Sequence, residues 1–430
     1  MKINLETRLR HSLLIAGLLL SLIATACVAP KSIIQLRPTI ILISLDGFRY
    51  DYLEKHQPPN LISLARDGVQ AKWMIPSFPT KTFPNHYAIA TGLYPQNNGI
   101  VENSVFDRSF NATFTMGNRE EVQNGRWWLG EPIWITAEKQ GQKSAPLFWP
   151  GSEAEIAGKR PTYWKPYEGA MANDARVSAL LGWLDLPSAD RPTFLGLYFS
   201  DVDTASHDFS PDAVETRDSV IKVDGDLGRL IEGLKTRGIF TQVNLIIVSD
   251  HGMATQNRND VVILDELFDT KLAEKILWSG EIVSIFPNPE TEEKIYSTLK
   301  AKLPPQAQVY RKAELPARLH YSNSSRIAPL VVLPSEGWTI STRKRFDEMK
   351  ARTQNNGLKG GHGYDNEFAS MRAIFIGHGP AFKKGAVIEP FENIQVYNVM
   401  TRILGLTAAP NDGNDSLANA ALAEDSARAR

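Results

Sequence analysis

The sequence contains little cysteine, little histidine and no excess of charge of either sign. Among its 430 residues Cys27 is the single cysteine, so the chain can form neither an intramolecular disulfide nor a cysteine-based zinc site. The formal net charge of −1 argues against a generally basic nucleic-acid binder, and we expect no nucleic-acid polymer as partner. With eight histidines, a metal would have to be bound by a few imidazoles together with carboxylates.

A bilayer-spanning run is also missing at the N-terminus. The apolar run from Leu13 to Ala26 is too short to cross a membrane comfortably, but it follows a basic segment and suits a secretory signal. We predict residues 1–26 as a signal peptide and place the mature protein in the periplasm or cell envelope of a bacterium. Cys27 is then either the lipid-bearing cysteine of a lipoprotein, attached to a membrane, or an incidental residue. Ala24 stands where lipoprotein signals usually have Leu.

Short apolar runs rich in β-branched residues predict buried strands. They are Thr39–Leu45, Thr193–Phe199, Leu245–Val248 and Arg372–Ile376. Helical patterns lie between them, for example at Pro59–Asp67 and Arg217–Gly233. This alternation predicts an α/β fold with a mostly parallel central sheet covered on both faces, in which ligands bind beyond the carboxyl ends of the strands.

The chain divides into one large domain with two additions. We predict a catalytic domain over residues 38–410, an aromatic-rich insertion over about 102–166 and a smaller subdomain over about 254–360. Residues 411–430 are polar and rich in alanine, which predicts a flexible tail.

Polar groups follow the predicted strands directly. Asp46 comes after the first strand, and the pair Asp250-His251 comes after the third. Adjacent polar groups at the end of a buried strand are costly unless they have a partner, and a metal ion is one such partner.

Three further residues complete a candidate ligand set. Asp203 and His207 are four residues apart and share one face if the segment is helical, although a surface pair would have the same spacing. His362 lies within Gly-Gly-His-Gly, where the backbone can approach an ion closely. Three carboxylates and three imidazoles suit two cations, and ligation without sulfur is typical of a catalytic zinc pair.

Thr82 lies just before a predicted helix start, where its hydroxyl is near backbone amide donors. By spacing alone, an ordinary helix cap is the favoured interpretation. We expect His86 and His378 to be structural residues.

Five sequence blocks resemble the nucleotide pyrophosphatase/phosphodiesterase family of the alkaline phosphatase superfamily. They are PTKTFPNHYAIATGLYPQNNGIVEN, FWPGSEAEI, DVDTASHDFSP, IIVSDHGM and GGHGYDN. Their order and spacing match from about Thr39 to Phe382. The resemblance implies an alkaline phosphatase-like α/β/α sandwich. It also implies a zinc-dependent phosphodiesterase that converts nucleoside triphosphates, dinucleotides or nucleotide diesters to nucleoside monophosphates.

The resemblance further implies a role for each matched residue. Two Zn²⁺ ions per chain are expected, the first bound by Asp46, Thr82, Asp250 and His251 and the second by Asp203, His207 and His362. Thr82 becomes the nucleophile that forms a phosphothreonine, and Asn103 donates to a phosphate oxygen. The slot for a base or headgroup is expected to contain Phe83, Met116, Trp164 and Tyr198. The family commonly has Tyr where Trp164 stands, so Tyr163 remains an alternative stacking residue.

Other functions stay open at this point. A choline-phosphodiester or lysophospholipid phosphodiesterase would use an aromatic cage around quaternary ammonium. A sulfatase fits less well, because Thr82 cannot supply the aldehyde nucleophile of that relative. A non-catalytic envelope binding protein would not need the complete ligand set. A phosphomonoesterase would need extra cationic groups, and Lys81 is the one basic residue beside the core motifs that could serve, so a diester is the better fit.

Overall fold

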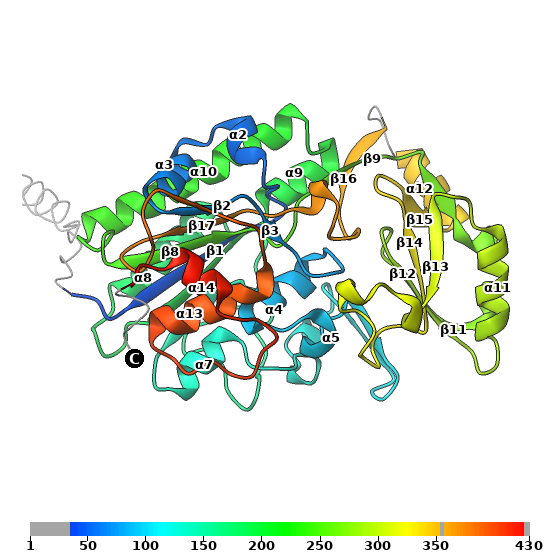
Figure 1. The fold of residues 1–430 in the computed structure, drawn as a ribbon, viewed down its shortest axis with the longest axis horizontal. Helices are drawn as coiled ribbons and strands as arrows, with labels where there is room; N and C mark the ends of the chain where they lie inside the picture. The colour runs from blue at the N-terminus through cyan, green and yellow to red at the C-terminus, as the bar shows by residue number, and fades with distance from the viewer. Residues whose placement is uncertain (1–34, 353–356, 425–430) are drawn as a thin grey trace, which may run out of the picture.

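The computed structural model describes residues 35–352 and 357–424. A seven-stranded sheet forms the centre of the larger part, in the order β18-β2-β17-β8-β1-β7-β6 (Figure 1). Its strands are β1 (Thr39–Leu45), β2 (Val69–Ala71), β6 (Ser144–Leu147), β7 (Phe194–Phe199), β8 (Val243–Val248), β17 (Phe375–His378) and β18 (Ala386–Ile388). β17 runs antiparallel to both of its neighbours, whereas the other strand pairs of this sheet are parallel. The predicted mostly parallel sheet is therefore confirmed.

The two faces of β1 supply two separate hydrophobic cores, because successive side chains of a strand point to opposite faces. Ile40 and Leu42 belong to one core, and Ile41 and Ile43 belong to the other. Helices cover both faces (Figure 1): α3 (Pro59–Asp67), α8 (Asn173–Leu184) and α10 (Val214–Thr236) on one, and α4 (Thr82–Thr91), α7 (Ile133–Lys139) and α13 (Val396–Leu404) on the other. This is the α/β/α sandwich that the sequence predicted.

The region predicted as a smaller subdomain contains a second sheet. Four antiparallel strands lie in the order β11-β12-β14-β13, with α11 (Glu292–Lys302) beside them (Figure 1). They are β11 (Ala273–Trp278), β12 (Val283–Pro287), β13 (Ala307–Arg311) and β14 (Leu330–Pro334). Two strand pairs join this sheet to the larger part: β9 (Ala254–Asn257) with β16 (Leu358–Gly361), and β10 (Val261–Ile263) with β15 (Thr339–Ser341). The next helix is α12 (Arg343–Arg352).

Only part of the segment 102–166, which was predicted as an insertion, lies outside the central sheet and its helices. Its first part forms a hairpin of β4 (Ser104–Asp107) and β5 (Ala112–Thr115), followed by α6 (Arg119–Val122). Its later part contributes β6 to the edge of the central sheet. Part of the segment therefore belongs to the core architecture rather than to an addition.

The prediction of a flexible tail is wrong for residues 411–424. Helix α14 (Ser416–Ala421) buries Leu417, Ala418 and Ala421 completely or nearly so. Asn411 donates a hydrogen bond to the side chain of Asn398, and Ser416 donates one to Gln395. A few apolar side chains on one helix face anchor a segment whose average composition is polar. Residues 425–430 lie outside the described residues.

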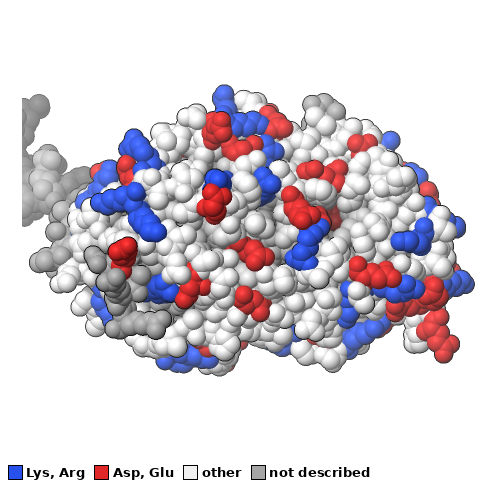
Figure 2. All heavy atoms as spheres, in the orientation of Figure 1, with Lys and Arg blue, Asp and Glu red and all other residues white. Residues whose placement is uncertain are grey.

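The predicted signal peptide, residues 1–26, and Cys27 lie outside the described residues. In the described part of the chain, every helix is too short or too polar to cross a membrane. Lys/Arg and Asp/Glu side chains are interspersed on the face shown in Figure 2, in keeping with the balanced net charge.

Candidate active site

The candidate site lies at the carboxyl ends of three adjacent strands. Asp46 follows β1, Asp250 and His251 follow β8, and Asp203 lies in the first turn of α9 (Asp201–Phe209), which follows β7. Since β7, β1 and β8 are neighbours and parallel, their ends bring these side chains together. The helix predicted from the spacing of Asp203 and His207 is confirmed as α9.

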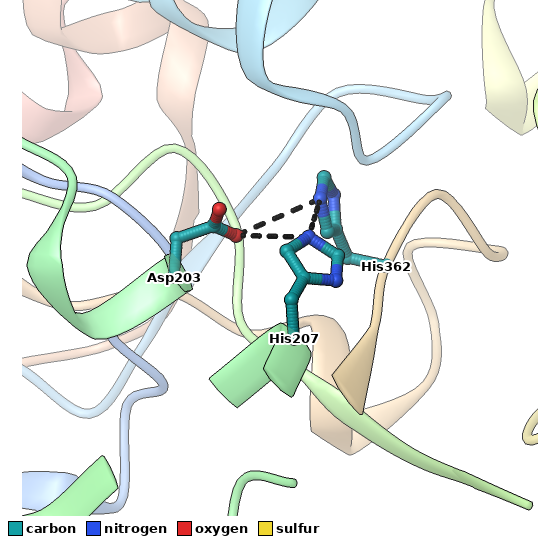
Figure 3. A group of neighbouring side chains, drawn as sticks. All are labelled: Asp203, His207 and His362. Atoms are coloured by element: carbon teal, nitrogen blue, oxygen red, sulfur yellow. Dashed lines mark hydrogen bonds and ion pairs between the residues drawn. The ribbon is translucent and has the colours of Figure 1, made fainter. Parts of the chain in front are cut away.

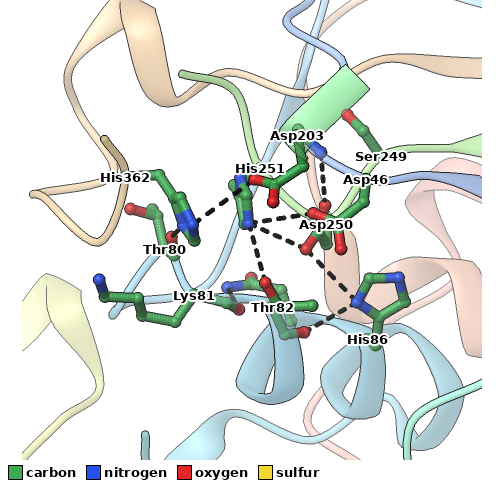
Figure 4. A network of polar contacts seen from close by, with 12 residues as sticks. Asp46, Thr80, Lys81, Thr82, His86, Asp203, Ser249, Asp250, His251 and His362 are labelled. Carbon is green, nitrogen blue, oxygen red and sulfur yellow. Dashed lines mark hydrogen bonds and ion pairs between the residues drawn. The ribbon is translucent and has the colours of Figure 1, made fainter. Parts of the chain in front are cut away.

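The first ligand group consists of Asp46, Asp250 and His251, which are all buried (Figure 4). His251 Nε2 lies 3.0 Å from Asp250 Oδ2 and 3.5 Å from Asp46 Oδ1. Burial, together with the charge of Asp203, raises the pKa of Asp250 to about 8. Burial and the charge of Asp250 also raise the pKa of Asp46. Two carboxylates this close in a buried site repel each other, and a bound cation would remove that cost.

The second ligand group consists of Asp203, His207 and His362 (Figure 3). His362 Nε2 lies 3.1 Å from His207 Nε2 and 3.7 Å from Asp203 Oδ1. His207 Nε2 lies 3.3 Å from Asp203 Oδ1, and its side chain is 39% exposed. The His251 and His362 rings are stacked with centroids 3.5 Å apart, so the two groups are adjacent.

In both groups the carboxylate oxygens and imidazole nitrogens are arranged as metal ligands would be. Three buried carboxylate oxygens accept no hydrogen bond within the described residues, namely Asp46 Oδ1, Asp203 Oδ1 and Asp250 Oδ2. Each histidine has its Nδ1 at a backbone carbonyl: His207 at Gly360 O, His251 at Gly252 O and His362 at Thr80 O. This arrangement fixes the ring and turns Nε2 toward the carboxylates of its group, as is usual for metal-bound histidine. The residues present therefore fit two metal ions.

Thr82 is the first residue of α4 rather than a residue before the helix, and the cap position is occupied by Lys81, whose side chain makes no capping hydrogen bond. Its Oγ1 lies 3.4 Å from His251 Nε2, at the first ligand group (Figure 4). The helix-cap interpretation is therefore wrong, and the hydroxyl is placed beside the predicted ligands at a helix N-terminus.

Asn103 contacts the residue that follows Thr82. Its Oδ1 accepts a hydrogen bond of 2.9 Å from the backbone N–H of Phe83, so its amide nitrogen is the end left to donate. Thr82, Asn103 and Met116 line one pocket of about 530 Å³, together with the second ligand group.

The predicted slot residues fall in different surroundings. The Phe83 ring packs against Phe114 and Trp128. The Tyr198 hydroxyl donates a 2.6 Å hydrogen bond to Asp46 Oδ2, so it supports a ligand of the first group.

Tyr163 and Trp164, the two predicted stacking residues, have partners of their own. The Tyr163 ring stacks on Trp183, and the Arg160 guanidinium lies over the Trp164 ring. Tyr167, which the sequence analysis did not consider, is 38% exposed, and its ring centroid lies 6.2 Å from that of Tyr198.

Two histidines were expected to be structural. His86 is fully buried and shares a 2.7 Å hydrogen bond with Ser44, and burial lowers its pKa to about 3. Its Nδ1 also lies 2.8 Å from Thr82 O, so the neutral ring holds the start of α4 against the sheet. His378 stacks on Phe240, far along the sheet from the ligand groups.

The chain is similar to known proteins over most of its length. A family model described as type I phosphodiesterase/nucleotide pyrophosphatase matches residues 40–365. A venom phosphodiesterase of Crotalus durissus collilineatus is 40% identical over 390 residues, which cover 88% of this chain and 46% of the relative. An uncharacterized pyrophosphatase/phosphodiesterase of Schizosaccharomyces pombe is 41% identical, with 87% of this chain and 78% of the relative covered. This chain spans about half the length of the venom relatives it matches.

Solved structures agree with the fold. Murine ectonucleotide pyrophosphatase/phosphodiesterase 5 superposes with a TM-score of 0.83 at 34% identity, covering 90% of this chain and 100% of that chain. A variant of the same murine protein, described as inactive, has alanine in place of a threonine and is in complex with AMP; its TM-score is also 0.83, at 33% identity.

Proposed function

Because the chain belongs to the type I phosphodiesterase/nucleotide pyrophosphatase family, we propose that it is a zinc-dependent phosphodiesterase that releases nucleoside monophosphates from nucleoside triphosphates, dinucleotides or nucleotide diesters. The observation that carries the proposal is the position of the Thr82 hydroxyl at the start of α4, beside the first ligand group.

Two Zn²⁺ ions are the proposed cofactors. Asp46, Asp250 and His251, with Thr82 Oγ1, would hold one, and Asp203, His207 and His362 would hold the other. Such ions lower the pKa of an adjacent hydroxyl and offset charge that develops on phosphate oxygens.

The residues of the chain have distinct proposed roles. Thr82 Oγ1 attacks the phosphorus that bears the nucleoside, so that the nucleotidyl group becomes attached to Thr82 and the leaving group departs; attack by water then releases the monophosphate. Asn103 donates from its amide nitrogen to a phosphate oxygen, and Phe83 N–H keeps that amide in orientation. Tyr198 orients Asp46 through its hydroxyl.

The base is proposed to stack between aromatic rings. Phe83 supplies one side, with Met116 at the pocket wall. For the other side we favour Tyr167, which lies next to Tyr198, over the earlier candidates Trp164 and Tyr163. The AMP complex of the murine relative supports a nucleotide in this family's site. A choline or lysophospholipid phosphodiester is the second candidate, because the same aromatic group could enclose a quaternary ammonium.

The proposed location of the protein is outside the cytoplasm. The signal-like residues 1–26 and the venom and ectoenzyme relatives support a protein that acts outside the cytoplasm, in the periplasm or envelope. We also propose that a lipid on Cys27 attaches the protein to a membrane.

A substrate panel tests the function. ATP, p-nitrophenyl thymidine monophosphate, p-nitrophenyl phosphate and a p-nitrophenyl choline phosphodiester should be compared on zinc-loaded protein. We expect the two nucleotides to have the highest kcat/KM. A preference for the choline diester would favour the second candidate, and a preference for the monoester would contradict a diesterase.

A further inference from the structure

A buried ionic network lies between the candidate active site and the β11–β14 sheet. Lys81 Nζ and Glu281 Oε2 form an ion pair of 2.5 Å, and both side chains are 8% exposed. Glu281 Oε1 accepts a 2.6 Å hydrogen bond from Gln256 Nε2, so both carboxylate oxygens are occupied. Lys81 immediately precedes Thr82, whereas Glu281 precedes β12 of the second sheet. The network therefore joins the nucleophile's segment to the subdomain.

The glycines around His362 provide the space for this network. A Cβ at Gly363, whose φ is +120°, would lie 2.3 Å from Lys81 Cε. A Cβ at Gly361 would lie 1.9 Å from Gln256 Nε2. Any larger residue on either side of His362 would displace a member of the network, so the Gly-Gly-His-Gly motif accommodates the Lys81–Glu281 pair as well as the metal ligand.

The pair also lines the pocket that faces the second ligand group. Lys81, Glu281, Lys359 and Arg345 are among its wall residues. Thr82, Asp203, His207 and His362 line the same pocket. In-line attack by Thr82 requires the leaving group to depart on the far side of the phosphorus, and a leaving group that occupies this pocket would lie beside this wall. The charge on this wall is therefore in a position to act on the leaving group, and Glu281 cancels the positive charge that lies nearest to Thr82 in sequence.

We propose that Glu281 is a specificity-determining residue that limits the enzyme's preference for polyanionic leaving groups by holding and neutralising Lys81. The inference rests on the proposed nucleotide phosphodiesterase function. On this account Lys81 is not a free phosphate-binding cation, because its charge is paired by Glu281, a residue of the subdomain.

The test compares two substrates that transfer the same nucleotidyl group. Thymidine triphosphate leaves pyrophosphate, whereas p-nitrophenyl thymidine monophosphate leaves p-nitrophenolate, so the ratio of their kcat/KM values reports the leaving-group side alone. Glu281→Gln keeps the shape and removes the charge. We expect the triphosphate-to-nitrophenyl ratio to rise about 5- to 50-fold, as a unit charge at close range would produce. Thermal unfolding and zinc content should be measured on each variant.

A double-mutant cycle assigns the effect to Lys81. Lys81→Met leaves the carboxylate unpaired and should lower the ratio, and Lys81→Met combined with Glu281→Gln should return it to within about threefold of the wild-type value. Glu274→Gln removes an exposed carboxylate of the same sheet, paired with Arg108, and serves as the matched control with an unchanged ratio.

Each outcome decides the inference. An unchanged ratio in folded, zinc-loaded Glu281→Gln overturns it and leaves the pair a structural contact. If Glu281→Gln does not fold, the Lys81→Met ratio decides, and a ratio equal to wild type overturns the inference. Wild-type protein that hydrolyses neither substrate contradicts the proposed function itself, whereas hydrolysis of both with insensitive ratios contradicts the role of Glu281 alone.

Discussion

At the scale of single residues, Thr82 distinguishes a catalytic site from a metal-binding one. Thr82 follows the cap position of α4, and its hydroxyl lies 3.4 Å from His251 Nε2. We predict that Thr82→Ala keeps the fold and most of the bound metal but loses nearly all turnover, because the six other ligands are unchanged. Steady-state kinetics and elemental analysis measure both properties.

Thr236→Ala is a suitable control for Thr82→Ala, since Thr236 is an exposed threonine at the end of α10. Its activity should equal that of wild type. A Thr82→Ala variant with near wild-type kcat would contradict the assignment of Thr82 as the nucleophile.

Tyr167 is the stacking residue proposed above, and its role can be separated from that of its neighbours. Stacking contributes about 1–3 kcal/mol per base, so Tyr167→Ala should lower kcat/KM for ATP about 5- to 150-fold, with a smaller loss for bis-p-nitrophenyl phosphate. Trp164→Ala should affect both substrates weakly, because its ring lies under Arg160. A selective loss in Trp164→Ala, with none in Tyr167→Ala, would restore the earlier assignment.

At the scale of elements, the sequence predicted the strands best where burial is continuous. β1 begins and ends as predicted. Its short run of apolar, mostly β-branched residues ends at the charged Asp46, and such a run is typical of a buried strand. The strand predicted at Arg372–Ile376 instead spans β17, Phe375–His378. β17 crosses the sheet antiparallel between β8 and β2, and neither its direction nor its register can be derived from local composition.

The C-terminal segment shows how tertiary contacts override composition. We predict that Leu417→Ala destabilises the protein by about 2–4 kcal/mol, since Leu417 is 1% exposed in the core that also contains α13. Val387→Ala, at a side chain that is 68% exposed on β18, should change stability by less than about 0.5 kcal/mol. Chemical denaturation compares the two variants; equal stabilities would mean that α14 does not contribute to the core.

The members of the two candidate ligand groups were predictable from the sequence, whereas their arrangement was not. Asp46 and Asp250 each follow a predicted strand. Because the carboxyl ends of parallel strands lie at the same edge of a sheet, these positions predict that the two side chains lie close together. The Nδ1 contacts of His207 and His362 with distant backbone carbonyls, and the ion pair of Lys81 with Glu281, depend on packing between segments that are remote in sequence. No periodicity signals such contacts.

At the scale of the whole molecule, metal binding should be linked to protons. Burial lowers the pKa of His207, but Asp203 outweighs it and raises the value to about 9, and burial raises the pKa of Asp250 to about 8. In metal-free protein near pH 7 both groups therefore carry protons that a metal ion must displace. Zinc affinity should rise with pH up to about 8–9 and fall in acid, because only the deprotonated groups bind metal.

Chelation with EDTA followed by competition titrations from pH 6 to 9 measures this linkage. We expect activity to be lost on chelation and recovered with about two zinc ions per chain. Full activity with no bound ion, or an affinity that does not change with pH, would contradict the two ligand groups.

The central claim is that Thr82 and the two ligand groups cleave at the phosphorus that bears the nucleoside. The most direct measurement is hydrolysis of ATP by zinc-loaded protein in ¹⁸O-labelled water, with mass spectrometry of the products. The account predicts AMP that carries the label, together with unlabelled pyrophosphate, and no such products from Thr82→Ala. Formation of ADP and phosphate, label in pyrophosphate rather than in AMP, or equal turnover by Thr82→Ala would contradict it.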